Sequence, residues 1–286
     1  MTDAIDLMHL GRDRVIAAYE PRPGVIIDPG PASCVEALLA GLRGEPRALL
    51  LTHIHLDHAG AAGVLARRFP GLRVYVHEVG APHLVDPSKL LASARRLYGD
   101  DMDRLWGEVA PVPADGIEPL AGGESVEGML VEYAPGHASH HVAYLDPDGS
   151  AYVGDVAGVR IPPSEFTLMP TPPPDIDLEA WWRSIEAVEK WGPRRLCLTH
   201  FGPVEDARAQ LDAAASRLRE AGERARPGDL KRFIDDLAAE LDAETDEATA
   251  RRLRQAAPPE QLYAGLHRYW RKRATTAPLQ RTQCLR

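Results

Sequence analysis

The 286-residue sequence has few cysteines, no long apolar run and a deficit of basic residues. Its three cysteines, Cys34, Cys197 and Cys284, show no Cys-x-x-Cys spacing, which argues against a disulfide framework or a zinc ribbon and fits a reducing compartment. No segment approaches the roughly 18 consecutive apolar residues that span a bilayer, and the first residues lack the apolar segment of a signal peptide. We therefore expect a cytoplasmic protein that does not contact a membrane.

The charge balance argues against a nucleic-acid partner. Lysine and arginine number 33 against 42 aspartates and glutamates, which gives a formal net charge of -9 at pH 7. Nucleic-acid affinity relies on clustered lysine and arginine, so we expect a small-molecule substrate instead. The hydrophobic fraction of 44% and the charged fraction of 26% are ordinary for a folded chain, and the length suits one large domain with a smaller appendage.

The first two thirds of the sequence alternate strand-like and helix-like segments. Apolar runs predict strands at 15–19, 24–30, 47–52 and 72–77. A hairpin closing on the turn that begins with Asp28 is expected, followed by a helix whose capping box starts at Ser33. Residues 79–110 predict helices that could form one wall of an active site, and short strands follow as far as residue 199.

The last third of the sequence is helical in pattern. Beyond about Pro203 the strand-like runs stop, and residues such as Leu230, Phe233 and Leu237 follow the spacing of an amphipathic helix. We expect three segments, which are a catalytic domain over 1–203, a helical extension over 204–273 and a flexible tail over 274–286. The extension either caps the active site or pairs with a second chain in a homodimer, and the sequence leaves both open.

A dense group of histidine and aspartate follows the leucine run that ends at Leu51. His53 and His55 are two residues apart, so on an extended chain their side chains point to the same side and can bind one ion. Asp57 and His58 come next, at the start of a predicted helix, where they can bind a second ion. Imidazole together with carboxylate suits zinc, iron or manganese better than calcium. Two ions need more ligands than one loop offers, so further ligands are expected downstream.

Residues 52–60, Thr-His-Ile-His-Leu-Asp-His-Ala-Gly, resemble the signature of the metallo-β-lactamase superfamily. The other blocks of that family's pattern appear in the expected order, as Pro135-Gly136-His137, Gly154-Asp155 and Thr199-His200. The resemblance covers about residues 10–203. It implies an α/β fold, specifically an αββα sandwich, here followed by the C-terminal helical extension.

The resemblance also implies a site for two divalent metal ions, with Zn²⁺ expected and Fe or Mn as alternatives. The implied ligands are His53, His55 and His137 for the first metal, Asp57, His58 and His200 for the second, and Asp155 as the bridge. A metal-bridging hydroxide would then attack the carbonyl group of a small-molecule ester, thioester, lactone or amide. The second metal or Asp57 would stabilise the leaving group, which gives Asp57 a catalytic role.

Other residues are expected to contact the substrate or to orient the metal ligands. His141, and with less support His140, is expected to orient a ligand or the substrate, because ligating imidazoles usually donate their other N–H group to an outer partner. Arg160 could bind a substrate carboxylate, with Phe166 on an adjoining apolar wall. Asp28 either orients a ligand or simply forms an Asp-Pro-Gly turn.

Three other functions remain open at this point. Glyoxalase II-like hydroxyacylglutathione thioesterases share the first motif and a helical extension, although their glutathione-binding residues are not matched in this sequence. Persulfide dioxygenases resemble the first motif but use a single iron held by two histidines and an aspartate. A binding or scaffolding module acting through the helical extension is opposed by the complete set of ligand residues.

Overall fold

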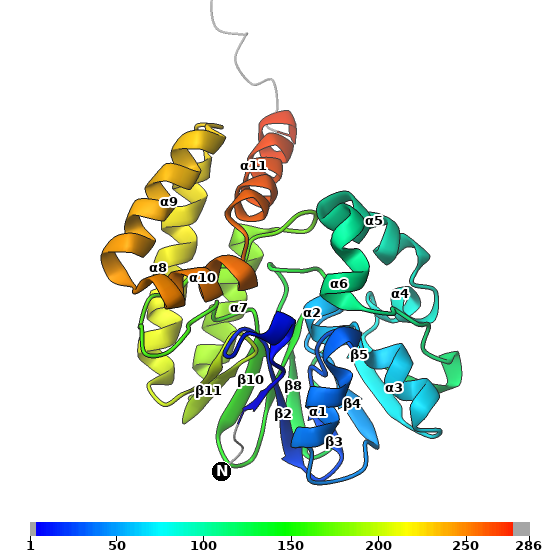
Figure 1. The fold of residues 1–286 in the computed structure, drawn as a ribbon. Helices are drawn as coiled ribbons and strands as arrows, with labels where there is room; N and C mark the ends of the chain where they lie inside the picture. Colours follow the sequence, from blue (N-terminus) through cyan, green and yellow to red (C-terminus); the bar gives the residue numbers. More distant parts are fainter. Residues whose placement is uncertain (1–3, 277–286) are drawn as a thin grey trace, which may run out of the picture.

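The computed structural model describes residues 4–276, which form two six-stranded sheets packed face to face between layers of helices (Figure 1). The first sheet has the strand order β1 (Ile5–Asp6), β2 (Ala17–Arg22), β3 (Val25–Ile27), β4 (Ala48–Leu50), β5 (Arg73–His77), β6 (Ile117–Leu120). The second has the order β12 (Gly202–Val204), β11 (Arg195–Leu198), β10 (Ser150–Gly154), β9 (Val142–Leu145), β8 (Met129–Tyr133), β7 (Ser125–Val126). This arrangement confirms the αββα sandwich that the sequence implied.

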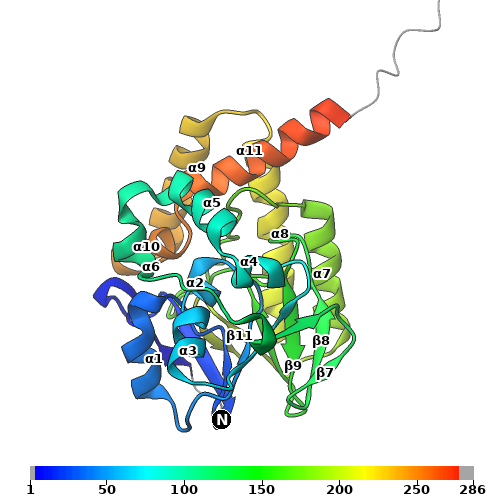
Figure 2. The ribbon, with the colours of Figure 1, turned by 90° about the vertical axis from the view of Figure 1, so that its right-hand side faces the viewer.

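Helices cover the outer face of each sheet, and three hydrophobic clusters join the layers (Figure 2). The helices that follow strands of the first sheet are α1 (Val35–Gly41), α2 (Leu56–Ala59), α3 (Ala62–Arg68), α4 (Ala81–Val85), α5 (Ser88–Tyr98) and α6 (Met102–Trp106). Leu38 of α1 and Leu65 of α3 pack on the first sheet, and Tyr144 lies in the cluster between the sheets. Trp181 of α7 (Leu178–Lys190) packs on the second sheet. Within residues 4–276, no helix is long and apolar enough to cross a membrane.

Parallel strand pairing brings the motif residues to one edge of each sheet. β3, β4 and β5 are parallel neighbours, so Asp28 after β3 and His53 after β4 leave the first sheet at the same end. In the second sheet β10 and β11 are parallel, and Asp155 and His200 follow them directly. β4 is buried along its whole length, as expected of a strand between two parallel neighbours.

Two local predictions are wrong. The hairpin of β2 and β3 turns around Gly24, whose φ of +76° suits glycine, and the predicted turn at Asp28 comes only after β3 has ended. The predicted Ser33 cap does not form, because α1 begins at Val35 and the Ser33 hydroxyl donates instead to the Leu105 carbonyl at 2.7 Å. A tertiary contact thus replaces a local one.

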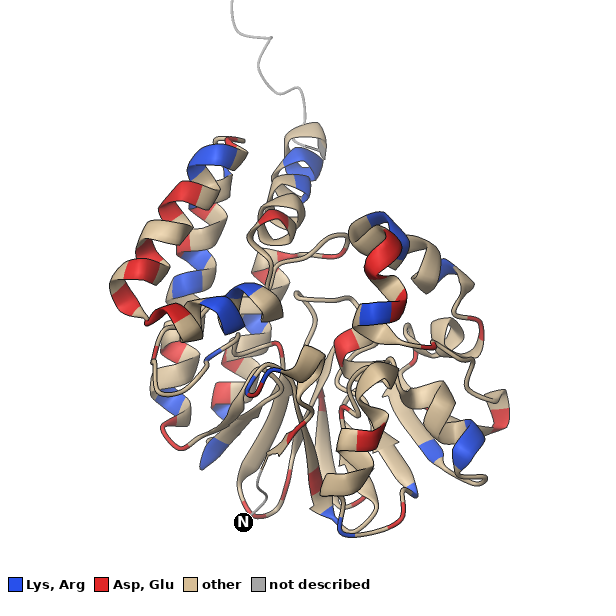
Figure 3. Ribbon diagram, viewed as in Figure 1, with Lys and Arg blue, Asp and Glu red and all other residues tan. Residues whose placement is uncertain are grey.

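The C-terminal helices confirm the amphipathic pattern seen in the sequence. They are α8 (Ala207–Ala225), α9 (Leu230–Glu244), α10 (Glu247–Ala256) and α11 (Pro259–Thr276). Phe233 and Leu237 of α9 belong to the same buried cluster as Trp181 of α7, so these helices share the core of the second sheet. Figure 3 shows aspartates and glutamates along most of α9, and lysines and arginines on α10 and α11.

The first turns of α7 and of three helices in the extension are set by local caps. Asp177, predicted as the cap of α7, accepts a hydrogen bond from the Ala180 N–H group at 2.9 Å, and this prediction is confirmed. Asp206, Asp229 and Asp246 cap the next three helices in the same way. Of the predicted flexible tail, residues 274–276 belong to α11, and the remainder lies outside the described residues.

The turn that presents His137 depends on Gly136. This glycine has a φ of +129°, and a Cβ added to it would lie 2.3 Å from the backbone nitrogen of Trp181 in α7. We expect Gly136→Ala to lower the free energy of unfolding by about 3 kcal/mol, because overpacking adds to the strain of the left-handed backbone. Denaturant unfolding with Gly192→Ala as control measures this.

The control isolates the packing term. Gly192 also has a positive φ, of +60°, but no heavy atom lies within 4 Å of an added Cβ. Its replacement should therefore cost only about 1 kcal/mol. Equal losses in the two variants would show that close packing against α7 does not constrain the turn.

Candidate metal centre

The structure brings together all seven of the side chains that the motifs suggest as metal ligands. His53 and His55 lie on the loop between β4 and α2, and Asp57 and His58 lie in α2 itself. The other three come from the loops that follow strands of the second sheet, namely His137, Asp155 and His200. Except for His55 and Asp57, which are partly exposed, these side chains are buried.

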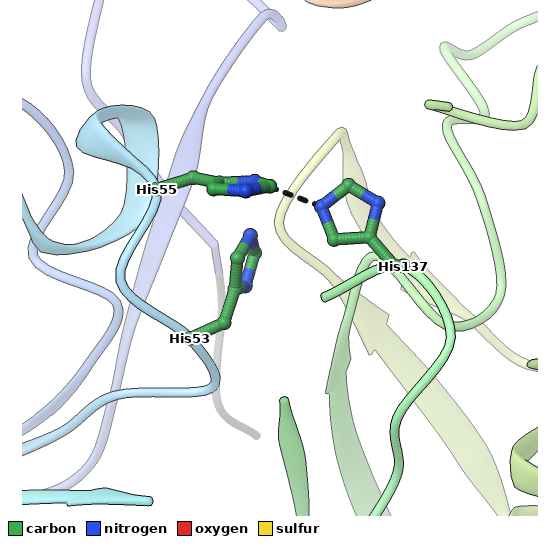
Figure 4. Close-up of side chains that lie close together, drawn as sticks. All are labelled: His53, His55 and His137. Atoms are coloured by element: carbon green, nitrogen blue, oxygen red, sulfur yellow. Dashed lines mark hydrogen bonds between the residues drawn. The ribbon is translucent and has the colours of Figure 1, made fainter. Parts of the chain in front are cut away.

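The side chains form three overlapping groups that could hold a metal ion. Within each group the candidate ligand atoms lie within 4.8 Å of one another, and the groups are His53, His55 and His137, then His53, His58 and Asp155, and finally Asp57, His58 and His200. Figure 4 shows the three imidazoles of the first group converging, two from the β4–α2 loop and one from the second sheet. Nε2 of His137 lies 2.9 Å from Nδ1 of His55.

Polar atoms in the cluster that make no hydrogen bond indicate that a cation fits there. Nε2 of His53, Nε2 of His58 and Oδ1 of Asp155 are buried and make no hydrogen bond among the described residues, although the last two lie 3.4 Å apart as an ion pair. Leaving such atoms unpaired in a folded protein is unfavourable, so each needs an explanation. Metal coordination supplies one, since imidazole nitrogen and carboxylate oxygen are the ligands that zinc, iron and manganese accept.

Backbone carbonyl groups fix the orientation of two imidazoles. Nδ1 of His137 lies 2.8 Å from the Pro170 carbonyl oxygen, and Nδ1 of His200 lies 2.6 Å from the Val15 carbonyl oxygen. A carbonyl oxygen only accepts, so Nδ1 carries the proton in both rings and the Nε2 atoms face the cluster. Nε2 of His137 lies 3.2 Å from Asp155, and Nε2 of His200 lies 3.4 Å from Asp57.

Asp28 connects the ends of both sheets to the cluster. Its buried carboxylate accepts hydrogen bonds from the Thr52 N–H group at 2.8 Å and from the hydroxyls of Thr52 and Thr199 at 2.7 and 3.0 Å. It also lies 2.8 Å from Nδ1 of His58, which leaves Nε2 of that ring for a metal. Asp28 adopts a left-handed backbone with φ of +48°. Of the two roles that the sequence left open, the contacts therefore match orientation of a ligand.

The protonation of the imidazoles differs across the cluster. Burial, followed by the neighbouring imidazoles, holds the pKa of His53 far below its usual value and lowers the pKa of His55 to about 3. Burial acts in the same direction on His58 and His200, but Asp155 and Asp57 outweigh it and raise the pKa of both rings. His53 and His55 are therefore neutral, whereas at His58 and His200 protons compete more strongly with a cation.

The two carboxylates of the cluster are ionised. Burial alone would raise the pKa of Asp57 and Asp155, but His58 outweighs it and, with the other imidazoles, lowers both pKa values below the usual range. Asp57 remains more accessible than Asp155, with 22% of its side chain exposed against 4%. Asp57 is therefore the carboxylate of the cluster that a substrate reaches more readily.

His140 and His141 lie against the cluster in different ways. Nε2 of His141 accepts a hydrogen bond from the Asp155 N–H group at 3.3 Å, and its ring stacks on that of His53 with centroids 4.8 Å apart. His141 thus touches two expected ligands, as its predicted orienting role requires. His140 lines the cavity beside the cluster, and its Nδ1 accepts a hydrogen bond from the Ile54 N–H group at 3.5 Å.

Arg160 and Phe166 lie away from the cluster, contrary to the expectation that they contact the substrate. Val159 and Leu168 pair in an isolated antiparallel bridge, which folds this loop back onto α8. Arg160 pairs with Glu165 at 2.9 Å and donates to Gln210, while Phe166 is buried with the guanidinium of Arg217 4.6 Å from its ring centroid. Neither side chain is among those that line the cavity over the cluster.

A cavity of about 430 Å³ opens above the cluster. Its walls come from α5 and α6, from the proline-rich loop 170–175 and from the junction of α10 and α11, which Figure 1 shows on either side of the upper edge of the sandwich. Leu90, Leu97 and Trp106 line it, which confirms that the segment 79–110 forms a wall. The wall at 255–262 matches one of the two alternatives left open for the helical extension, that it caps the site, and this segment reaches the cavity through tertiary packing.

Comparisons with known proteins agree with this geometry. The family model of the metallo-beta-lactamase superfamily matches residues 15–200. The crystal structure of an archaeal superfamily protein, ST1585 from Sulfolobus tokodaii, has a TM-score of 0.60 and 26% identity, covering 73% of this chain and 80% of that one. The structure of TTHA1623 in a di-iron-bound form has a TM-score of 0.52 and 27% identity, covering 70% of this chain and 92% of that one.

Curated relatives match over shorter stretches. The metallo-beta-lactamase fold-containing protein ST1585 of Sulfurisphaera tokodaii is 28% identical over 163 residues, which is 54% of this chain and 60% of that protein. A hydroxyacylglutathione hydrolase of Xanthomonas campestris is 31% identical over 135 residues, which is 46% of this chain and 40% of that protein. These matches thus span less than two thirds of either relative. The family model, in contrast, covers the sandwich from β2 to His200, and the chain belongs to the metallo-beta-lactamase superfamily.

Proposed function

We propose that this protein is a hydrolase that uses two divalent metal ions to cleave a small-molecule ester, thioester, lactone or amide. The observation that carries the proposal is the set of buried ligand atoms on His53, His58 and Asp155 that make no hydrogen bond among the described residues, within groups whose ligand atoms lie within 4.8 Å of one another. His53, His55 and His137 would hold one ion and Asp57, His58 and His200 the other, with Asp155 between them. Zinc is the ion we propose, with iron or manganese as alternatives.

The reaction needs an attacking water, a polarised carbonyl group and a route for one proton. Bound divalent cations would lower the pKa of water and polarise the carbonyl oxygen. The water oxygen bonds to the carbonyl carbon, the C–O, C–S or C–N bond breaks, and a proton passes to the leaving group. Asp57 faces the cavity and lies 3.4 Å from Nε2 of His200, so its carboxylate is placed to carry that proton.

A glutathione thioesterase is the second candidate. It is supported by the similarity to hydroxyacylglutathione hydrolases, which covers less than half of this chain. A mononuclear iron dioxygenase, the alternative from another class, would need only one ion per chain. The three overlapping ligand groups favour two ions instead.

Hydrolysis should depend on the carboxylate between the two ligand groups. Asp155→Asn removes one negative charge, so we expect kcat/KM of the zinc-loaded protein to fall at least ~1,000-fold, because each ion contributes several kcal/mol to the transition state. A panel of thioester, lactone, ester and amide substrates measures this. Arg160→Ala is the control. Because Arg160 does not line the cavity, its replacement should change kcat/KM by no more than about twofold. Failure of protein carrying two ions to cleave any of these classes would contradict the proposal.

Metal loading should occur in two steps with pH. A cation bound at Asp57, His58 and His200 must displace protons from imidazoles of raised pKa, whereas His53 and His55 are already neutral. As the pH falls from about 8 to about 5, we expect the ion at the second group to dissociate before the ion at the first. Equilibrium dialysis against Zn²⁺ with elemental analysis measures the ions per chain, and circular dichroism checks that the fold persists. Simultaneous loss of both ions would refute this order.

Asp28 should raise metal affinity without touching the metal. We expect Asp28→Asn to weaken Zn²⁺ binding roughly 10- to 100-fold, because a carboxylate that accepts the Nδ1 proton of a ligating His58 increases the basicity of that ring. Competition with a chromophoric chelator measures the affinity, and Asp148→Asn serves as the surface control. An unchanged affinity in folded Asp28→Asn protein would mean that Asp28 only shapes the turn.

A further inference from the structure

The cavity over the metal cluster has a polar floor and apolar walls. His55, Asp57 and His200 are among the side chains at the floor. The walls present leucine, alanine and proline from three separate segments, represented by Leu90 of α5, Pro173 of the proline-rich loop and Leu262 of α11. A substrate that reaches the floor with its reacting group must therefore place the rest of its surface against hydrocarbon.

Several polar side chains on the walls are already hydrogen-bonded within the protein, whereas His83, Lys89 and Ser93 also line the cavity. The Tyr98 hydroxyl donates to Gln261 at 3.3 Å, and the Ser139 hydroxyl donates to Asp175 at 2.7 Å. The Gln255 amide donates to the His9 carbonyl oxygen at 3.1 Å. One buried donor on the walls is unpaired among the described residues, the indole nitrogen of Trp106. A substrate with many polar groups would find few partners there and would lose hydration.

The walls also lack the positive charge that an anionic substrate needs. Lys89 is the sole lysine or arginine that lines the cavity, and it is exposed to solvent at the rim. Asp175 adds a negative charge to the lining. Glutathione carries two carboxylates and one ammonium group at neutral pH, and carboxylates of this kind are usually bound by bidentate arginine. Within the described residues the cavity offers no such group.

The apolar lining continues outward to the rim. Val79 and Leu97 both line the cavity, yet they are 45% and 37% exposed, respectively. Exposed apolar residues that extend a pocket in this way lengthen the hydrocarbon surface available to a ligand. The volume of about 430 Å³ lies within the range of cavities that hold small organic ligands.

Building on the proposed hydrolase function, we propose that the substrate is an uncharged, lipophilic acyl ester or acyl thioester. The carbonyl group lies at the metal cluster, and the alkyl chain lies along the walls formed by α5, α6, the proline-rich loop and the junction of α10 and α11. The leaving group carries no carboxylate. This substrate class separates the protein from a glutathione thioesterase, which would have to bind two carboxylates in the same space.

Matched thioesters test the proposal directly. Acyl thioesters of N-acetylcysteamine, which are uncharged, are compared from acetyl to decanoyl on the zinc-loaded protein. We expect kcat/KM to rise roughly 3- to 4-fold for each added methylene until the cavity is full, because burying a methylene is worth about 0.8 kcal/mol. The glutathione thioester of the same acyl group should be at least ~10-fold poorer. Indifference to chain length, or a preference for the glutathione thioester, would overturn the proposal.

A pair of leucine variants tests whether the alkyl chain of the substrate lies along α5. Leu97→Arg puts a charge at the rim of the cavity, so the ratio of kcat/KM for decanoyl and acetyl thioesters should fall at least ~10-fold. Leu130→Arg is the matched control, because Leu130 is 51% exposed on β8 and does not line the cavity, and its ratio should match that of the wild type. Equal ratios in the two variants would show that the alkyl chain of the substrate does not lie along α5.

Binding separates failure of this proposal from failure of the hydrolase function. If protein with two zinc ions cleaves no thioester, the hydrolase function fails, but calorimetry with octanamide and S-hexylglutathione still tests the cavity because neither compound is hydrolysed as a thioester. In the metal-free protein, we expect octanamide to bind at least ~10-fold more tightly than S-hexylglutathione. Tighter binding of S-hexylglutathione, or no binding of octanamide, would contradict an apolar substrate.

Discussion

Imidazole nitrogens and carboxylate oxygens are buried together at one point, where protein groups supply too few hydrogen bonds for them. His53, His58 and Asp155 each leave a buried ligand atom without a hydrogen-bond partner. A fold tolerates such atoms only where something compensates for their lost hydration, and two cations would satisfy all three. The surrounding architecture is consistent with that requirement. The loops that follow parallel strands in both sheets lie at the same edge. There the Asp28 carboxylate accepts a hydrogen bond from Thr199 of the second sheet and also contacts Nδ1 of His58.

The remainder of the chain determines what can reach this point. α5, α6 and the C-terminal helices rise on opposite sides of the edge that carries the cluster, and their apolar side chains enclose most of the cavity. The contact between Tyr98 and Gln261 joins the two walls across 163 residues of sequence. The helical extension therefore has a double role, since it shares the core of the second sheet and also contributes to the lining of the site. In this arrangement the sandwich carries the histidine and aspartate cluster, and the helices form most of the apolar lining above it.

The histidine and aspartate cluster could be predicted from the sequence because its members stand in short motifs. His53 and His55 lie two residues apart after a buried strand, and His137, Asp155 and His200 also follow strands, so strand polarity brings these five near one edge. Features that depend on long-range packing were not predictable in this way. The placement of Arg160 is fixed by the Val159–Leu168 bridge and by Gln210 of α8, and neither contact has a local signature. The Ser33 cap was displaced by a hydrogen bond to Leu105 for the same reason.

The most direct test of the central claim is a crystal structure of the zinc-loaded protein with anomalous diffraction measured at the zinc absorption edge. We expect two anomalous peaks roughly 3.5–4 Å apart, one among His53, His55 and His137 and the other among Asp57, His58 and His200, with Asp155 beside both. A single peak, or zinc bound elsewhere while these side chains remain unliganded, would contradict this expectation.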